Sequence, residues 1–383
     1  MKVLGIIVEY NPFHNGHILH IQKSKELIKP DVTIAVMSSS FVQRGEPAII
    51  DKWQRSLLAL EYGVDLVIEL PFVYACQSAD YFSKGSIKLL NEIGVTDLCF
   101  GSECGDINEF IEIAKAIKEH NGKYNTYVKE AMKQGMRYPN ACNQALIKIL
   151  KKEVRTPNDL LGLSYVKEII FNDYNIIPHC ILRTNDYHSE SLSPISSASA
   201  IRKAITSHLD YTIALPHSEY YQNDIYCLES FFPYLKYQLL TSSVDELKQY
   251  HMVDEGIENL LIQNITKSNN MDDYIQSLLS KRYTKPRIQR MLIHILMKNT
   301  KEDIIEAMDL DFIRILAMNE NGREYLNKVK KKLSFHLITN FTKHHHKALD
   351  IELKATKLLS IISHTNIIDK EFSSIPYTPK KKL

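Results

Sequence analysis

Two histidines near the N-terminus are spaced for chemistry on a phosphate group. His14 and His17 lie three residues apart, with Gly16 between them, shortly after the apolar run Val3–Val8. Each imidazole can donate a hydrogen bond to a phosphate oxygen, and the glycine allows the backbone to approach a ligand closely. A bare H-x-G-H pattern is as often a polar turn as a site, because short motifs recur by chance. The surrounding elements therefore decide its meaning.

Those elements favour an anion site. The run Val3–Val8 predicts a buried strand, Asn11-Pro12 ends it, and apolar spacing from His17 to Leu27 indicates a helix. At the start of such a helix, free backbone N–H groups and the helix dipole point at one spot. The loop resembles that of the HIGH-motif nucleotidylyltransferase superfamily, in which it holds ATP phosphates.

A second phosphate-binding pattern lies about 180 residues later, at Ile195-Ser-Ser-Ala-Ser-Ala-Ile-Arg202. Ser196, Ser197 and Ser199 begin a predicted helix, and Arg202 lies one turn inside it. Hydroxyls, backbone N–H groups and a guanidinium at a helix start can clamp a phosphate. The alternative is a capped helix with an exposed arginine. The segment resembles the I-S-S-x-x-I-R signature of nucleotidylyltransferases.

Strand-like and helix-like segments alternate from residue 1 to about 205, which predicts a parallel sheet with helices on both faces. The expected strands are Val3–Val8, Val32–Ser38, Asp65–Leu70, Asp97–Gly101 and Ile176–Leu182. The expected helices are His17–Ile28, Asp51–Tyr62, Ala79–Ile93, Ile107–Glu119, Tyr124–Gln134, Asn140–Leu150 and Asn158–Phe171. Ligands of such sheets bind beyond the carboxyl ends of the strands.

Polar residues at those strand ends are further candidates. Gly101 follows the fourth strand and offers a backbone N–H, although a plain turn glycine is equally consistent. Asn158 begins a helix after Pro157, either as a cap or as a partner for adenine or ribose. Arg183 ends the fifth strand, where it can reach phosphate or ribose. Gln43 and Arg44 follow the second strand and can reach a phosphate or a substrate carboxylate.

The chain after residue 209 reads as mainly helical and carries a basic segment. Residues 281–350 hold 15 Lys/Arg and 8 Asp/Glu, whereas the net charge of the whole chain is only +2. One basic segment on a slightly acidic body suggests a docking face for a polyanion, the alternative being a solvated surface. The candidate cations form two groups: Lys281, Arg282, Lys285, Arg287 and Arg290, then Lys328, Lys330, Lys331 and Lys332.

Composition indicates an ordinary globular protein of two or three domains. Of 383 residues, 44% are hydrophobic and 24% charged, and no apolar run reaches membrane-spanning length. The N-terminus leads directly into a strand, which predicts no signal peptide. Six cysteines without a C-x-x-C pair predict reduced thiols in a cytoplasmic protein and no protein-held metal.

The whole chain resembles the bacterial tRNA(Met) cytidine acetate ligase family. The resemblance covers G-I-I-V-E-Y-N-P-F-H-N-G-H, F-V-Q-R-G-E-P-A, D-K-W-Q-R, G-V-D-L-V-I-E-L-P, F-G-S-E, P-N-D-L-L-G, S-S-A-S-A-I-R and K-R-Y-T-K-P-R-I-Q-R-M-L. It implies an α/β fold, with a Rossmann-like doubly wound parallel sheet of the nucleotidylyltransferase type. It further implies a catalytic ATP-binding domain over residues 1–208 and a helical tRNA-binding domain over 209–383.

The resemblance also implies an activity. The family activates acetate with ATP as acetyl-adenylate and then acetylates the N4 amine of the wobble cytidine of elongator tRNA(Met). His14 and His17 would be catalytic, Ser196, Ser197 and Arg202 would hold pyrophosphate, and Mg²⁺ would accompany the phosphates. The tRNA contacts would come from Lys281, Arg282, Lys285, Arg287, Arg290, Lys330, Lys331 and Lys332. Carried over by position, the ATP contacts are Ile7, Val8, Glu9, Tyr10, Asn11, Pro12, Phe13, His14, Asn15, Gly16, His17, Ile18, Leu19, His20, Gly101, Asn158, Arg183 and Thr184.

Three other functions remain open from the residues alone. A nucleotidylyltransferase joining ATP to a small phosphate ester would need no basic C-terminal half. A relative of aminoacyl-tRNA synthetases would carry a K-M-S-K-S-like loop in place of I-S-S-A-S-A-I-R. A non-catalytic tRNA-binding protein would not need the paired histidines. No membrane or protein partner is implied by any of the motifs.

Overall fold

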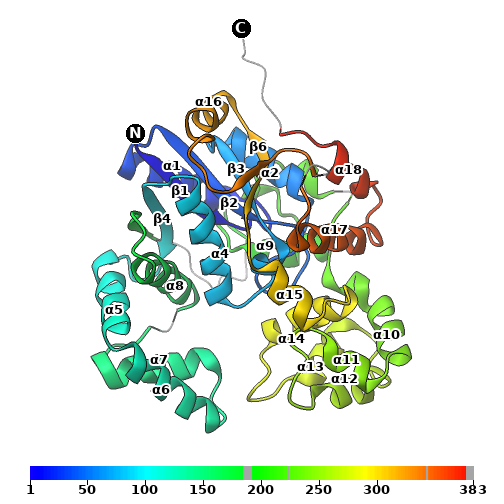
Figure 1. Ribbon diagram of the computed structural model, residues 1–383. Helices are drawn as coiled ribbons and strands as arrows, with labels where there is room; N and C mark the ends of the chain where they lie inside the picture. Colours follow the sequence, from blue (N-terminus) through cyan, green and yellow to red (C-terminus); the bar gives the residue numbers. More distant parts are fainter. Residues whose placement is uncertain (155, 184–191, 223, 342–343, 377–383) are drawn as a thin grey trace.

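A seven-stranded sheet forms the centre of the molecule in the computed structural model (Figure 1), which describes residues 1–383 except 155, 184–191, 223, 342–343 and 377–383. The strand order is β5-β4-β1-β2-β3-β6-β7. The strands are β1 (Val3–Val8), β2 (Val32–Ser38), β3 (Leu66–Leu70), β4 (Asp97–Ser102), β5 (Ile177–Leu182), β6 (Phe312–Met318) and β7 (His336–Ile338). All five strands predicted from the sequence are present with nearly the predicted bounds.

The first five strands run parallel, so their carboxyl ends share one edge. Strand β1 pairs with β2 on one side and β4 on the other, while β3 and β5 extend the sheet outward. The order reverses on the two sides of β1, which places a crevice beyond its carboxyl end. The loop that carries His14 and His17 leaves β1 at this point.

Helices cover both faces because alternate residues of each strand belong to different cores. In β1, Leu4 and Ile6 pack with residues of α1 (Asn15–Ile28) and α2 (Lys52–Glu61), whereas Val3 packs on the opposite face. That opposite face is covered by α4 (Ala79–Glu92) and α8 (Pro157–Phe171). The predicted doubly wound sheet is therefore confirmed.

The C-terminal half contributes two strands that the sequence analysis did not predict. Strand β6 pairs antiparallel with β3, and β7 pairs parallel with β6. The run Phe312-Ile-Arg-Ile-Leu-Ala-Met318 is apolar except for Arg314, which is itself buried, as suits a strand inside a sheet. The chain after residue 209 is mainly helical, as expected, but the sequence analysis named no strand there, and the sheet includes residues from both sides of that position.

Two helical lobes extend below the sheet (Figure 1). The first contains α5 (Ile107–Glu119), α6 (Asn121–Lys133) and α7 (Tyr138–Leu150). The second contains α10 (Phe232–Thr241), α11 (Val244–Gln249), α12 (Ile257–Ile265), α13 (Met271–Leu278), α14 (Lys285–Leu296) and α15 (Lys301–Ala307). The remaining described helices are α3 (Phe72–Ala75), α9 (Ala198–Thr206), α16 (Glu320–Val329), α17 (Lys347–Ser360), α18 (Ile367–Ser373), η1 (Thr212–Ala214), η2 (Ser218–Tyr221) and η3 (Leu228–Phe231).

A cluster of buried ion pairs connects the N-terminal and C-terminal halves of the chain. Lys52 Nζ lies 2.6 Å from carboxylate oxygens of Glu69 and Glu371 and 3.2 Å from one of Glu352. Arg314 binds Glu69 at 2.9 Å and Glu371 at 2.5 Å. All five side chains are at least nine-tenths buried. The cluster joins α2 and β3 to β6, α17 and α18.

The sequence analysis expected no membrane-spanning segment and reduced cysteines. Within the described residues, no helix combines the length and apolar character needed to cross a bilayer. The six cysteines are all free thiols.

The cluster leads to a stability prediction. Lys52→Met should lower the free energy of unfolding by about 3–5 kcal/mol, because it leaves buried carboxylates uncompensated. Lys118→Met is the matched control, since its pair with Asp173 is largely exposed and should contribute at most about 1 kcal/mol. Denaturant titration followed by circular dichroism measures both. Equal midpoints for the two variants would contradict a stabilising role for the cluster.

Candidate active site

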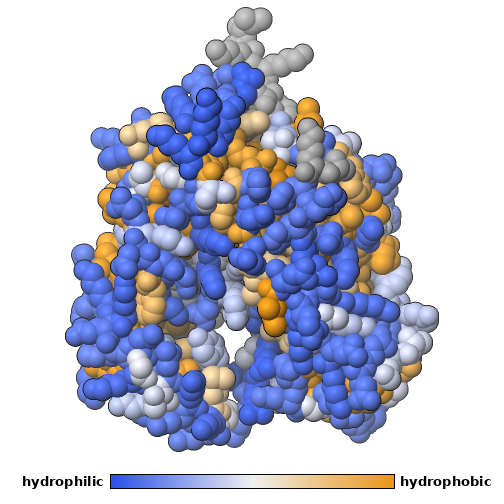
Figure 2. Space-filling view, viewed as in Figure 1, coloured by the Kyte–Doolittle hydropathy of each residue, from blue (hydrophilic) through white to orange (hydrophobic). Residues whose placement is uncertain are grey.

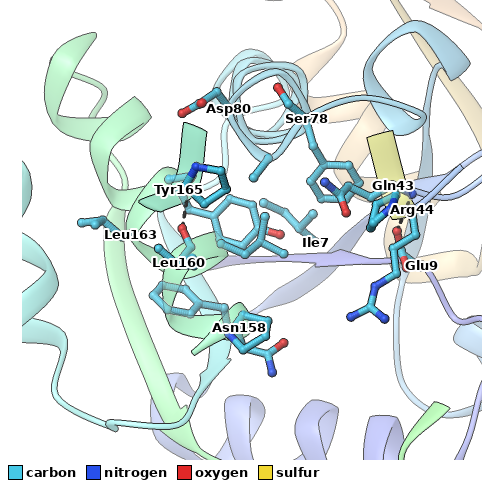
Figure 3. A pocket seen from close by; sticks show the side chains of 18 of the residues that line it. Ile7, Glu9, Gln43, Arg44, Ser78, Asp80, Asn158, Leu160, Leu163 and Tyr165 are labelled. Carbon is cyan, nitrogen blue, oxygen red and sulfur yellow. Dashed lines mark hydrogen bonds between the residues drawn. The ribbon is translucent and has the colours of Figure 1, made fainter. Parts of the chain in front are cut away.

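A cavity of about 1370 Å³ lies beyond the carboxyl ends of the parallel strands. Its walls come from the end of β1, the starts of α1, α4 and α9, the helices α6 to α8, and α14. In Figure 3, Ser78 and Asp80 lie across the pocket from Asn158, and Glu9 lies with Gln43 and Arg44 on a third side. The lining residues that the structure describes include 11 Lys/Arg and 4 Asp/Glu, so the cavity attracts anions.

The two histidines of the predicted motif form the cap of helix α1. His14 is the N-cap residue, and its Nδ1 accepts a hydrogen bond of 3.0 Å from the Gly16 N–H. His17 Nδ1 accepts from the His14 N–H at 3.3 Å, which completes a reciprocal capping box. The helix therefore begins at Asn15, two residues earlier than predicted. The two rings lie 3.9 Å apart between centroids.

Burial and neighbouring cations keep both imidazoles neutral. His14 is buried, and desolvation together with Arg183 and Arg202 lowers its pKa to about 3. Desolvation, then His14, His20 and Arg183, lowers the pKa of His17 well below its usual value. Since each Nδ1 is used as an acceptor, the proton of each neutral ring must lie on Nε2. The cap thus leaves two Nε2–H donors, and both histidines line the cavity.

The start of α9 supplies a second set of donors, but not all the predicted ones. Ser197 caps the helix by accepting from the Ala200 N–H, and it lines the cavity with Arg202. Arg202 Nη1 donates to the Asn11 carbonyl at 2.7 Å, which connects α9 to the histidine loop. Ser196 is buried, bonds the backbone of Ser193 in both directions and does not line the cavity. The prediction that its side chain joins the phosphate clamp is not supported by this placement.

The strand-end candidates gather on the β4–β5 side. Gly101, Asn158 and Arg183 all line the cavity. The Arg183 side chain lies against Gly101. A Cβ added to Gly101 would lie 3.1 Å from the Cγ of Arg183. Asn158 donates to the side chain of Glu103, which the sequence analysis did not single out. Thr184 lies outside the residues that the structure describes.

The predicted stretch from Ile7 to His20 divides into two groups. Those that line the cavity are Ile7, Val8, Glu9, Asn11, His14, Gly16, Leu19, His17 and His20, and those that do not are Tyr10, Pro12, Phe13, Asn15 and Ile18. Tyr10 and Phe13 are fully buried, with ring centroids 4.7 Å apart, and support the loop from beneath. Asn15 instead donates to the carbonyls of Pro194 and Ile213. Sequence position alone could not separate these groups.

A loop after β2 connects the site to helix α14. The Gln43 N–H donates to Glu9 Oε1 at 2.8 Å, and the Gln43 carbonyl accepts from Arg290 Nη1 at 3.0 Å. Gly45 has a φ of +81° and packs against the backbone of α14, where a Cβ would stand 2.3 Å from the Arg290 nitrogen. A side chain at this position is excluded by both conformation and space. Arg290 is thus buried against the site and is not an exposed cation.

The two predicted basic groups lie at opposite ends of the sheet. Arg282 and Arg287 line the cavity, whereas Lys281 and Lys285 do not, and Lys285 pairs with Asp272 at 2.8 Å. Lys330, Lys331 and Lys332 follow α16. The N-cap of that helix, Asn319, contacts Asp65 before β3, and its residue Asn321 contacts Asp31 before β2. Figure 1 shows α16 at the top and α14 below. The second group therefore does not border the cavity.

Comparisons with known proteins agree with this geometry. A family model described as HIGH Nucleotidyl Transferase matches residues 1–373. Proteins named tRNA(Met) cytidine acetate ligase are similar over nearly their whole length. One from Bacillus subtilis (strain 168) is 42% identical over 94% of this chain and 92% of the relative. One from Anoxybacillus flavithermus is 43% identical over 93% of this chain and 94% of the relative. The chain belongs to the tRNA(Met) cytidine acetate ligase family.

A solved structure of a similar protein supports the same assignment. The crystal structure of Thermotoga maritima TmcAL bound with alpha-thio ATP is 32% identical, covers 99% of both chains and has a TM-score of 0.88. Its apo form gives a TM-score of 0.89. In this member of the tRNA(Met) cytidine acetate ligase family, the cavity at the histidine cap is therefore the candidate nucleotide site.

The Nε2–H donors lead to a prediction that separates chemistry from capping. His14→Asn keeps a good N-cap residue but removes the donor, so acetate-dependent exchange of pyrophosphate into ATP should fall about 10²–10³-fold. The thermal midpoint should stay close to the wild-type value.

His346→Asn is the matched control for this variant. His346 caps α17 in the same way, with Nδ1 accepting from the Ala348 N–H at 3.0 Å, but does not line the cavity. Its exchange activity should be unchanged. Near-normal exchange in His14→Asn would contradict the role of the His14 donor.

Proposed function

We propose that this chain is an ATP-dependent ligase that activates acetate as acetyl-adenylate and transfers the acetyl group to a cytidine of tRNA(Met). The observation that carries the proposal is the two-histidine cap, which leaves a proton for each Nε2 on two residues that line a cationic cavity with Arg183 and Arg202. Membership in a family whose relatives bear the name tRNA(Met) cytidine acetate ligase supports it. The elongator tRNA, the wobble position and the N4 amine are the finer parts of the proposal.

The first half-reaction follows from where charge develops. A carboxylate oxygen of acetate attacks the α-phosphorus, and the bond to pyrophosphate breaks with its electron pair on the leaving group. Negative charge therefore grows on the phosphoryl oxygens and on pyrophosphate. The Nε2–H groups of His14 and His17, with Ser197 and Arg202 at the start of α9, are preorganised to stabilise that charge. The neutral histidines act as hydrogen-bond donors, and no covalent nucleophile is needed.

The second half-reaction needs positioning more than a base. The cytidine N4 attacks the carbonyl carbon of acetyl-adenylate, and the carbon–oxygen bond to AMP breaks with its electrons on the AMP phosphate. The amine proton is released as the new amide forms. Acetyl-adenylate is already activated, so holding the amine close to the carbonyl supplies most of the remaining acceleration.

Mg²⁺ is proposed to arrive with ATP. The described residues contain no group of three or more His, Cys, Asp or Glu side chains that could hold a metal ion. A carboxylate of the lining, Glu9, already accepts from the Gln43 N–H. The carboxylates that line the cavity therefore fit a Mg²⁺ ion held mainly by the triphosphate and water, which is the usual state of Mg²⁺ with ATP. Such an ion would offset the charge of the phosphates.

The two halves of the chain are proposed to divide the work. Residues 1–208 would bind ATP and form acetyl-adenylate, and residues 209–383 would bind tRNA. Of the first basic group, Arg282, Arg287 and the buried Arg290 line the cavity. We expect the protein to act in the cytoplasm, where its substrates are found. No protein partner is required for either half-reaction.

The source of the acetyl group provides the direct test of the proposal. Exchange of labelled pyrophosphate into ATP should depend on acetate, and tRNA acetylation should require ATP and acetate together. Acetyl-CoA without ATP should give no product, because the site is built for phosphate. Exchange driven by an amino acid would favour a synthetase-like enzyme, and transfer of AMP to a phosphate ester would favour a plain nucleotidylyltransferase. Either result would contradict the proposed ligase.

A further inference from the structure

The cavity opens to solvent between the two helical lobes. One wall consists of α6, α7 and the turn between them, and the other includes the segment before α14 and its first turn. Figure 1 shows the two lobes side by side below the sheet, and Figure 2 shows a gap between them at the lower end of the molecule. A macromolecule that reaches the histidine cap through this opening must pass between both walls.

The wall formed by α6 and α7 carries cations that no motif identified. Lys129 and Lys133 are exposed and lie one turn apart on α6, so they point to the same side of the helix, and both line the cavity. Neither has an ion-pair or hydrogen-bond partner among the residues that the structure describes. Arg137 and Tyr138, at the start of α7, are also exposed and also line the cavity.

The opposite wall carries cations at the same opening. Arg282 pairs with Glu255 at 2.9 Å, and the Arg287 guanidinium lies 4.4 Å from the centroid of the Tyr283 ring. The walls are in contact where Arg137 donates to the backbone carbonyls of Lys281 and Ser280 at 3.0 and 3.1 Å. The opening is therefore bordered by positive charge on both sides.

We propose that the α6–α7 wall is a second RNA-binding surface, which holds the phosphates of the single-stranded tRNA loop opposite α14. The proposal rests on the proposed function. A loop is the part of tRNA that suits this opening, because an unpaired base can leave its stack and reach an enclosed site. Unpaired lysines offer sequence-independent attraction to phosphates, and the exposed Tyr138 ring offers a stacking surface for a base.

The α6 lysines do not belong to the nucleotide site already described. That site uses the cap of α1, the start of α9 and the ends of β4 and β5. The charge of the lining exceeds what one triphosphate requires, since 11 Lys/Arg face 4 Asp/Glu. A polyanion longer than a triphosphate, such as the tRNA loop, would cross the opening and contact the cations at its border that ATP does not require. Lys129 and Lys133 therefore act in tRNA binding and not in adenylate formation.

The test is a double charge reversal, Lys129→Glu with Lys133→Glu. Affinity for tRNA should fall on the order of tenfold at 0.1 M salt, and the salt slope of binding should decrease by about 1.4 if two single-strand phosphate contacts are lost. Acetate-dependent pyrophosphate exchange and the KM for ATP should stay at wild-type values. Lys115→Glu with Lys123→Glu is the matched control, because these exposed lysines of the same lobe do not line the cavity.

Each outcome decides one question. Equal tRNA affinity in the test and control variants, or a loss confined to the KM for ATP, would overturn the second RNA surface. Loss of affinity with circular dichroism altered from wild type would be resolved by Lys129→Gln with Lys133→Gln, which should retain the fold and still weaken binding. Absence of acetate-dependent exchange in the wild-type enzyme would instead contradict the proposed function and leave the measured RNA surface standing.

Discussion

The start of helix α1 is the constraint on which the site depends. The N-terminal turn of a helix has unpaired N–H groups, and here two imidazoles satisfy them through Nδ1. This one arrangement fixes the ring orientation and excludes a proton from Nδ1, so the proton of each ring lies on Nε2 of a residue that lines the cavity. Burial, and then nearby cations that include Arg183, lower the pKa of both rings, so the donors need no charge and no rearrangement when phosphate arrives.

The rest of the fold holds that cap against both halves of the chain. Arg55, fully buried, donates to the carbonyls of Glu9 and Ser38, which joins the ends of β1 and β2. Gln43 then connects Glu9 to Arg290 of α14, and Gly45 lets α14 pack directly on the loop. The side of the cavity that we propose faces tRNA is thus built on the same loop as the proposed nucleotide side. A ligase with two half-reactions needs this closeness, because acetyl-adenylate must meet the amine without exposure to water.

Patterns of neighbouring residues in the sequence predicted the strands, turns and helix starts that depend mainly on those neighbouring residues. The apolar run of β1, the break at Asn11-Pro12 and the apolar spacing of α1 predicted that the histidines lie between a strand and a helix start, with the helix start two residues too late. Packing decided the rest. Ser196 and Phe13 stand in the motifs yet face inward, β6 reads as one apolar run among helices, and Lys129 and Lys133 lie in no motif. Such placements depend on distant chain segments, which spacing along one sequence does not reveal.

The neutral donor state of His14 and His17 is tested most directly by nitrogen-15 NMR of the histidine rings in the intact protein between pH 5 and 8. The lowered pKa values predict that both rings of the ligand-free protein remain neutral, with Nε2 protonated and Nδ1 unprotonated, throughout this range. Each assignment is made by comparison with the single His→Asn variant. Titration of either ring near pH 6.5, or a proton on either Nδ1, would contradict the account.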